Sequence, residues 1–215
     1  MKCGCNLIGG ETAEHPGIGL PPGYFDLAAF CIGFEEHTSG YPVSMDMDVL
    51  GWSSYGLGTN GYSLVRDIYD IHSRSELEQY YVELKQTLGE SLLKPLAIYI
   101  RNVKDLEWCI EFSAHAHITG GGLLENIPRI LPDDCAVEID LRTWERPPIF
   151  KLIQEKGNLA DEEMFRVFNQ GLQMVSIVSV SKYIRDNMPG YIQRIGRVIR
   201  RPSSGAQVIF KGSFQ

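Results

Sequence analysis

Segments with two different hydrophobic periods follow one another along the chain. Short, nearly uninterrupted apolar runs at residues 26–34 (DLAAFCIGF) and 47–54 (MDVLGWSS) are typical of buried strands. Further segments of strand length lie in the second half of the chain, at residues 112–118, 135–141, 174–180, 191–199 and 206–212. The pattern therefore predicts strands along the whole chain, with other elements between them.

Helical spacing occurs between these strands. Apolar side chains recur every three to four positions in residues 62–71 and 75–88, and Ser75 caps the second segment with an acid three residues on. Further helices are predicted from Pro95 to about residue 109, with proline in the first turn, and at about residues 147–156. A short helix is also expected between the strands at 174–180 and 191–199.

Strands that alternate with helices indicate an α/β or α+β fold, with a mixed sheet flanked by helices. The loop at residues 35–42 (EEHTSGYP) is rich in turn-forming residues and is the predicted linker. We therefore expect a small N-terminal piece at residues 1–35 and an α/β domain at residues 36–215.

Composition narrows the class of protein. The chain has 215 residues, of which 44% are hydrophobic, enough for a substantial core, and its formal charge is −7. Because an acidic chain does not attract a phosphodiester backbone, nucleic acid is not an expected partner. Four arginines near the C-terminus, Arg194, Arg197, Arg200 and Arg201, are interpreted instead as the solvated face of a strand.

Cysteine usage and hydropathy indicate the compartment. The five cysteines are odd in number and lack paired C-x-x-C spacing, so neither a disulfide framework nor a structural zinc site is expected. No apolar run reaches the roughly 20 residues that span a bilayer, and the N-terminus lacks the order of a secretory signal. These features predict a cytoplasmic protein without a membrane partner.

Two glycine-rich loops each stand between a predicted strand and a helix. In HITGGGLLENIPR (residues 117–129), unpaired backbone N–H groups at a helix start would bind a phosphate, and glycine permits close approach. A tight turn with positive φ explains the same glycines without a ligand. The loop YGLGTNGYSLVR (residues 55–66) repeats the order, with Thr59, Asn60 and Arg66 as candidate contacts. The pair favours one shared anionic ligand, although Asn-Gly is also common in tight turns.

Acidic residues lie near glycines in the N-terminal piece. Glu11 and Glu14 belong to GGETAEHPG, and Asp26 begins the first predicted strand. These carboxylates suit Mg²⁺, which prefers oxygen ligands and takes one or two from protein when it carries nucleotide phosphates. A solvated loop with two acids is the alternative. His117, at a predicted strand end, is either an acid or base or a hydrogen-bonded structural residue.

Six phrases together resemble one enzyme family. They occur in the order and at about the spacing found in the phosphoribosylformylglycinamidine cyclo-ligases, also called aminoimidazole ribonucleotide synthetases: GCNLIGGETAEHPG, DLAAFCIGF, TNGYSLVR, AHITGGGLLENIPRILP, WERPPIFKLIQEKGNLADEEMFRVFNQG and IGRV. The resemblance covers nearly the whole chain. It implies a fold shared with selenophosphate synthetase and thiamine phosphate kinase, with residues 36–215 as the C-terminal-type domain and residues 1–35 as a remnant of the N-terminal, ATP-binding domain.

The resemblance implies a ligase of purine biosynthesis that uses ATP and Mg²⁺. ATP would activate the amide oxygen of formylglycinamidine ribonucleotide, the ring amine would attack, and phosphate would leave to give aminoimidazole ribonucleotide. The protein would mainly position the reactants and stabilise charge.

Site residues follow from the same resemblance. The residues implied to hold the ribose phosphate are Thr119, Gly120, Gly121, Gly122 and Asn126. Asn60 and His117 would be catalytic residues near the amidine. The residues implied on the nucleotide side are Glu11, Thr12, Glu14 and Asp26, of which the three acids would bind the metal.

The chain departs from the family pattern in and near these motifs. Gly58 stands where a histidine is expected, Leu96 and Ala97 replace a threonine and an arginine, and Gln170 and Gln173 occupy positions that are usually small. The nucleotide loop and the metal loop of the family's first domain are absent from these 215 residues. A homo-oligomer or a separate N-terminal-domain chain is therefore expected to cover the open strand edge of the remnant.

Two functions remain. The chain is a cyclo-ligase, whole or as its C-terminal two-thirds acting with a separate N-terminal part, or it is a catalytically degenerate member that serves as a binding or structural subunit. The retained loop at residues 120–122, with Glu11, Glu14 and His117, favours the enzyme. Gly58 and the absent nucleotide loop favour the subunit.

Overall fold

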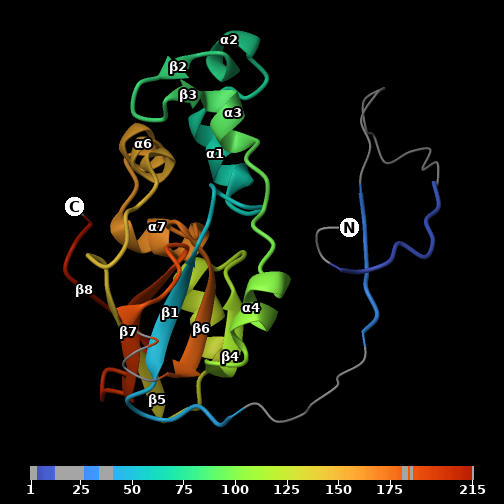
Figure 1. The fold of residues 1–215 in the computed structure, drawn as a ribbon. Helices are drawn as coiled ribbons and strands as arrows, with labels where there is room; N and C mark the ends of the chain where they lie inside the picture. Colours follow the sequence, from blue (N-terminus) through green and yellow to red (C-terminus); the bar gives the residue numbers. More distant parts are fainter. Residues whose placement is uncertain (1–3, 13–26, 34–40, 181–183, 185, 215) are drawn as a thin grey trace. The chain divides into compact units, whose positions relative to one another are not determined.

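The computed structural model describes residues 4–12, 27–33, 41–180, 184 and 186–214, and the chain divides into two units, residues 1–39 and 40–215. The larger unit contains a six-stranded sheet and its helices (Figure 1). The strands of the sheet are β1 (Asp48–Ser53), β4 (Glu111–His117), β5 (Cys135–Asp140), β6 (Leu172–Ser179), β7 (Ile192–Arg200) and β8 (Val208–Lys211). The helices are α1 (Tyr62–Ile68), α2 (Arg74–Leu77), α3 (Leu88–Leu92), α4 (Ile100–Leu106), α5 (Gly122–Asn126), the 3₁₀ turn η1 (Ile127–Ile130), α6 (Pro148–Gly157) and α7 (Asp161–Val167).

The sheet is mixed, as the sequence predicts. Its strand order is β4-β6-β1-β7-β5-β8, and every pair is antiparallel except β5 with β8. Strand β1 lies between β6 and β7, which come more than a hundred residues later in the chain. Both Val49 and Leu50 of β1 are fully buried although they point to opposite faces, which explains the uninterrupted apolar run.

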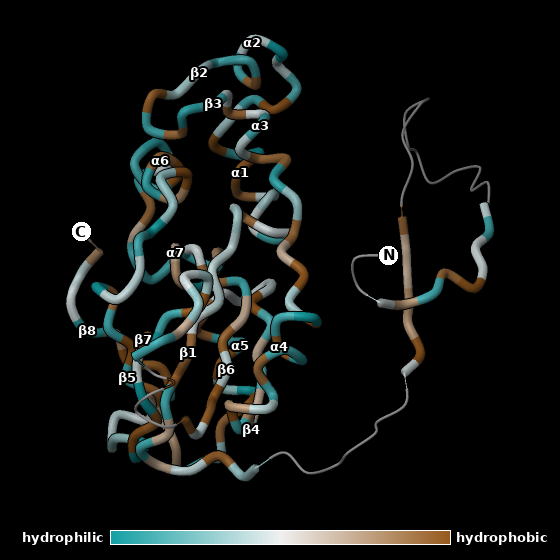
Figure 2. Tube along the Cα trace, viewed as in Figure 1, coloured by the Kyte–Doolittle hydropathy of each residue, from teal (hydrophilic) through white to brown (hydrophobic). Residues whose placement is uncertain are grey.

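Helices cover the sheet unequally. One face packs Val49 and its neighbours against Leu123 of α5 and Phe165 of α7. On the other face, α4 covers the half formed by β4, β6 and β1, where Leu50 and Trp52 meet the helix. A separate apolar cluster joins α1, α3, α6 and α7 beyond the end of the sheet. The hydropathy of the chain follows this plan, with apolar segments along the strands (Figure 2).

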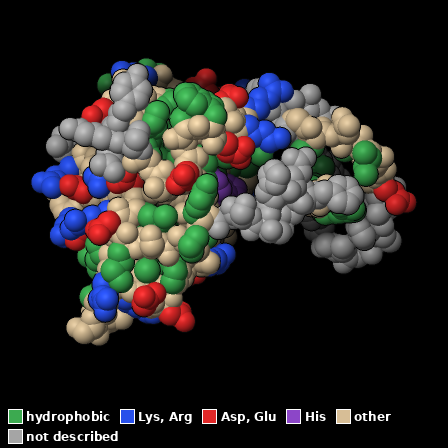
Figure 3. Space-filling view, turned by 60° about the horizontal axis from the view of Figure 1, so that its bottom comes forward, with side chains coloured by type: hydrophobic (Ala, Val, Ile, Leu, Met, Phe, Trp, Pro, Cys, Tyr) green, Lys and Arg blue, Asp and Glu red, His purple; other side chains and the backbone are tan. Residues whose placement is uncertain are grey.

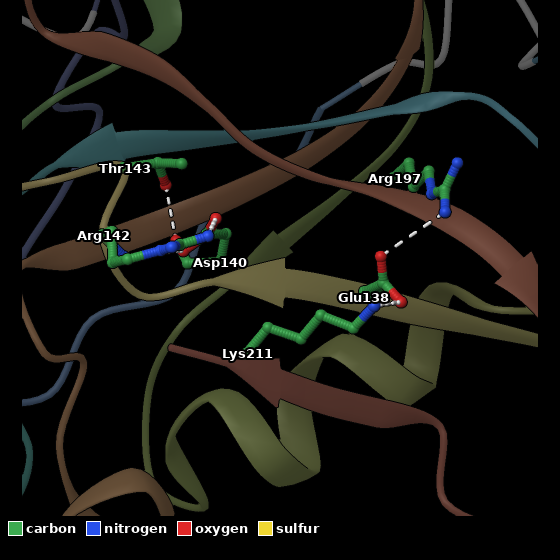
Figure 4. A network of polar contacts seen from close by, with 6 residues as sticks. All are labelled: Glu138, Asp140, Arg142, Thr143, Arg197 and Lys211. Atoms are coloured by element: carbon green, nitrogen blue, oxygen red, sulfur yellow. Dashed lines mark hydrogen bonds and ion pairs between the residues drawn. The ribbon is translucent and has the colours of Figure 1, made fainter. Parts of the chain in front are cut away.

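The half of that second face formed by β7, β5 and β8 carries an ionic network instead of a helix. Glu138 accepts hydrogen bonds from Lys211 (Nζ–Oε2 2.6 Å) and lies 3.5 Å from Arg197, while Asp140 binds Arg142 at 2.7 Å (Figure 4). The bond from Lys211 holds the pKa of Glu138 below its usual range. Acidic and basic side chains are intermixed on this flank (Figure 3). The predicted solvated face is confirmed at Arg194 and Arg197, which are exposed.

The prediction of one helix at residues 75–88 is wrong, because several short elements occupy this range. Helix α2 begins after Ser73, whose hydroxyl caps Glu76, and ends within four residues. A small hairpin follows, β2 (Tyr80–Tyr81) with β3 (Gln86–Thr87), because tyrosine and valine favour strand and Lys85 turns the chain with φ of 55°. The capping box that does form joins Thr87 to Glu90 and starts α3.

The helix predicted from Pro95 also starts too early. Residues 94–99 are irregular, and α4 begins after Tyr99, whose hydroxyl donates to the Ser53 carbonyl at 2.7 Å and whose ring contacts Trp52 edge-on. These anchors fix Tyr99 in front of the helix. Helix α7, with three acids in its first turn, is not predicted by the apolar pattern. Of the short helix expected before β7, residues 184 and 186 are described and helical, whereas residues 181–183 and 185 lie outside the described residues.

The strand predicted at 26–34 is not found in its described part. Residues 27–33 form no strand, and Leu27 and Phe30 are 88% and 89% exposed. A strand requires a neighbour for its backbone hydrogen bonds, and the described residues supply none here. The interpretation of residues 1–35 as a domain remnant stays a prediction.

Candidate functional site

The two glycine-rich loops line one pocket. The hollow has a volume of about 430 Å³ and opens between the start of α1, the start of α5 and the end of α7. The residues that line this glycine-loop pocket are Gly61, Ser63, Leu64, Asp67, Gly120, Gly121, Glu125, Glu163, Arg166 and Val167. Loops sixty residues apart in sequence thus meet at one site, as a shared ligand requires.

Asparagine side chains hold the two loops in place. The Asn60 amide donates to the carbonyls of Thr119 (3.3 Å) and Val167 (2.9 Å), which ties the first loop to the second and to the end of α7. Asn169 is fully buried and donates to the carbonyls of Gly56 and Leu57, both at 3.0 Å. Sequence reasoning missed Asn169, although an asparagine two residues before a glycine in FNQG is a signal of backbone bonding.

Asn126 closes the triple-glycine loop on itself. It is buried, and its amide nitrogen donates to the carbonyls of Gly120 (3.1 Å) and Gly122 (2.8 Å), while its oxygen accepts from the Thr119 hydroxyl at 3.3 Å. The hydrogen-bonding groups of this side chain are therefore used within the loop, and Asn126 does not line the pocket. Asn126 positions the glycines.

The three glycines differ in what the fold requires of them. Gly122 has φ of 56°, and a Cβ there would overlap the carbonyl oxygen of Phe165 in α7. Gly121 has φ of 95°, which side chains rarely adopt. Gly120 has neither constraint, because its φ is not left-handed and a Cβ would meet nothing within 4 Å. Only Gly120 lacks a reason within the described fold to be glycine, and it faces the pocket.

Charges around the pocket are unequal. Asp67, Glu125 and Glu163 line it with a single described cation, Arg166, which binds Glu163 through Nε at 3.0 Å and Nη2 at 2.5 Å. The hydrogen-bonded Glu163 carboxylate raises the pKa of Arg166. Because α5 has only five residues, its end adds little positive charge. An anion bound here would depend on loop N–H groups and on Arg166.

The remaining predicted site residues lie elsewhere. His117 is exposed at the end of β4 and does not line the pocket. Glu11 and Thr12 are exposed in the small unit, while Glu14 and Asp26 lie outside the described residues. No three His, Cys, Asp or Glu side chains gather as metal ligands in the part of the chain that the structure describes. The predicted metal set therefore stays a prediction.

Gly58, where the resemblance expects a histidine, adopts φ of 74°. A Cβ at this position would lie 3.1 Å from the amide nitrogen of Gln173, a buried side chain. The backbone and the neighbouring side chain thus both favour glycine at position 58.

Comparison with known proteins identifies the family. Residues 47–209 match the family described as AIR synthase related protein, C-terminal domain. The chain is 41% identical over 217 residues to a protein from Bacillus cereus (strain Q1) named phosphoribosylformylglycinamidine cyclo-ligase, covering 98% of this chain and 62% of that protein. A protein of the same name from Geobacillus sp. (strain WCH70) is 39% identical, with 99% and 62% covered.

Two solved structures show a more distant likeness. Thiamine monophosphate kinase from Aquifex aeolicus is 16% identical, with 81% of this chain and 52% of that chain covered and a TM-score of 0.48. The hydrogenase maturation protein HypE from E. coli is 15% identical, with 82% and 49% covered and a TM-score of 0.47.

No helix among the described residues is both long and apolar enough to cross a membrane.

The family match covers most of the chain, and the matched residues contain both glycine-rich loops and the sheet as far as the first half of β8. The chain spans 62% of the length of the curated relatives cited above. The chain therefore belongs to the AIR synthase related protein family, through that family's C-terminal domain.

Proposed function

We propose that this chain takes part in the ATP-dependent closure of formylglycinamidine ribonucleotide to aminoimidazole ribonucleotide, and that residues 40–215 hold the ribose phosphate of the substrate. The observation that carries the proposal is the meeting of two glycine-rich loops at one pocket, held together by the Asn60 amide. The names of the Bacillus and Geobacillus relatives support the same reaction. ATP and Mg²⁺ belong to the proposal as the agents that activate the amide oxygen.

Each loop residue has a defined task in this proposal. The Gly122 N–H donates to the Thr119 carbonyl at 3.0 Å, which leaves the N–H groups of Gly120 and Gly121 for the phosphate. Asn126 fixes the direction of those groups through its bonds to the loop carbonyls. Asn60 and His117 would serve the amidine end of the substrate. The nucleotide would lie with Glu11, Thr12, Glu14 and Asp26.

Ribose 5-phosphate binding tests the phosphate site without requiring turnover. We expect Gly120→Ala to fold normally and to weaken binding by about tenfold or more, because a methyl group would hold the phosphate away from the two N–H groups. Gly190→Ala is the matched control, since a Cβ there also meets nothing within 4 Å and Gly190 does not line the pocket. Calorimetric titration measures both. Equal affinities for the two variants would contradict the site.

A second candidate is a catalytically degenerate subunit that keeps the phosphate site. Gly58 favours it, because its left-handed backbone and the adjacent Gln173 disfavour a proton-transferring side chain at that position. The two candidates differ in turnover and not in phosphate binding, so an activity measurement on the reconstituted protein separates them.

A further inference from the structure

Arg166 is the one described cation that lines the glycine-loop pocket. We propose that Arg166 is the side chain that recognises the phosphate of a ribose phosphate ester, exchanging its bond to Glu163 for one to the ligand. This inference rests on the proposed function, because it names the residue that makes the same pocket selective for an anion.

The position of Arg166 is fixed by the triple-glycine loop. The carbonyl oxygen of Arg166 would lie 2.9 Å from a Cβ at Gly122, so the end of α7 and the loop touch backbone to backbone. The next residue, Val167, accepts a hydrogen bond from Asn60 of the other loop. The arginine is thus attached where both loops converge, and movement of either loop would move it.

The present partner of Arg166 is easily displaced. Both of its bonds go to one oxygen of Glu163, and the two side chains are 56% and 33% exposed. Exposed ion pairs of this kind contribute little to stability, because water competes and both side chains must be ordered. The guanidinium has five N–H donors, so a phosphate can receive a two-point bond from it.

Charge balance makes the arginine necessary. The pocket is lined by Asp67, Glu125 and Glu163, and a phosphate dianion would be repelled by all three. Two backbone N–H groups carry no net charge. Without Arg166 the pocket would disfavour the ligand that its glycine loops are shaped to accept.

Three substitutions in the full chain test this, with ribose 5-phosphate as the probe at low ionic strength. We expect Arg166→Met to weaken binding about 10- to 100-fold, and Arg166→Lys to weaken it less, since lysine keeps the charge without the fork of donors. We expect Glu163→Gln to strengthen binding by up to about fivefold, because it frees the arginine and removes an acid. A purely structural role for the pair would not raise affinity.

Arg74→Met is the matched control. Arg74 also pairs with a glutamate a few residues further along the chain, Glu78, at 2.7 Å, but it does not line the pocket. Unfolding midpoints of all variants confirm that each remains folded. Normal binding by Arg166→Met, together with weakened binding by Gly120→Ala, would overturn the role of Arg166 and leave the phosphate site standing. Absence of binding by the unmodified chain would overturn both.

Discussion

Residues of one type perform unlike tasks within a single loop. Gly122 permits two backbones to touch, Gly121 supplies a left-handed turn, and Gly120 leaves open the space that a ligand would use. Replacing a glycine that permits a contact inside the fold lowers the stability of the protein. Replacing a glycine that leaves space for a ligand lowers only the affinity for that ligand. Substitution therefore separates the two kinds.

Gly122→Ala is expected to destabilise the fold by about 3 kcal/mol or more, because the methyl group would overlap the Phe165 carbonyl and α7 must shift away from the loop. Urea unfolding followed by tryptophan fluorescence measures the change. Gly120→Ala is the neighbour in which we expect less than about 0.5 kcal/mol, typical of a substitution without a clash. Equal stability of the two variants would show that α7 does not press on the loop.

At the scale of elements, buried polar side chains join neighbouring strands as apolar packing does. Ser176 of β6 is fully buried and accepts a bond from the Trp52 indole at 2.8 Å, while its hydroxyl lies 2.7 Å from Nδ1 of His115. If Nδ1 carries no proton, the serine hydroxyl can donate to it while accepting the bond from the indole. Burial of this edge of the ring lowers the pKa of His115, although the side chain keeps an exposed edge.

This network predicts a dependence of stability on pH. The unfolded chain takes up a proton on His115 near the ordinary pKa of about 6.5, whereas the native chain resists it, so the free energy of unfolding falls as pH decreases below about 7. His115→Asn keeps a polar group toward Ser176 and cannot titrate. We expect its unfolding free energy to fall less between about pH 7.5 and 5.5 than that of the unmodified chain. Parallel curves for the two proteins would contradict the prediction.

The apolar pattern predicts the strands of the sheet because burial on one or both faces leaves a direct trace in sequence. It fails at α2 and α4, where tertiary anchors such as the Tyr99 bond to Ser53 decide where a helix starts. For the site, glycine spacing predicts the two loops and their common pocket. It does not predict Asn169, Glu125 or Arg166, since their proximity to the loops depends on how α5 and α7 meet the sheet.

At the scale of the whole molecule, the proposed reaction needs more groups than the larger unit supplies. Residues 40–215 present a pocket with features for a phosphate ester, whereas the predicted nucleotide residues lie in residues 1–39 and are exposed where they are described. In the curated relatives this chain matches 62% of the length, so the rest of those proteins has no counterpart in these 215 residues. The proposed reaction therefore needs an ATP site beyond what residues 40–215 supply.

Reconstitution tests this division of labour. We expect a polypeptide of these 215 residues to form no aminoimidazole ribonucleotide from formylglycinamidine ribonucleotide and ATP, because in-line phosphoryl transfer requires the β- and γ-phosphates to be held with Mg²⁺. Adding the unmatched portion of the Bacillus cereus relative is expected to produce turnover, measured by diazo coupling of the aminoimidazole product and by phosphate release. Gly120→Ala should lower that turnover and Gly190→Ala should not. Robust product formation by the 215 residues alone would contradict the need for further ATP-site residues, whereas phosphate-ester binding without turnover in the mixture would favour the degenerate subunit.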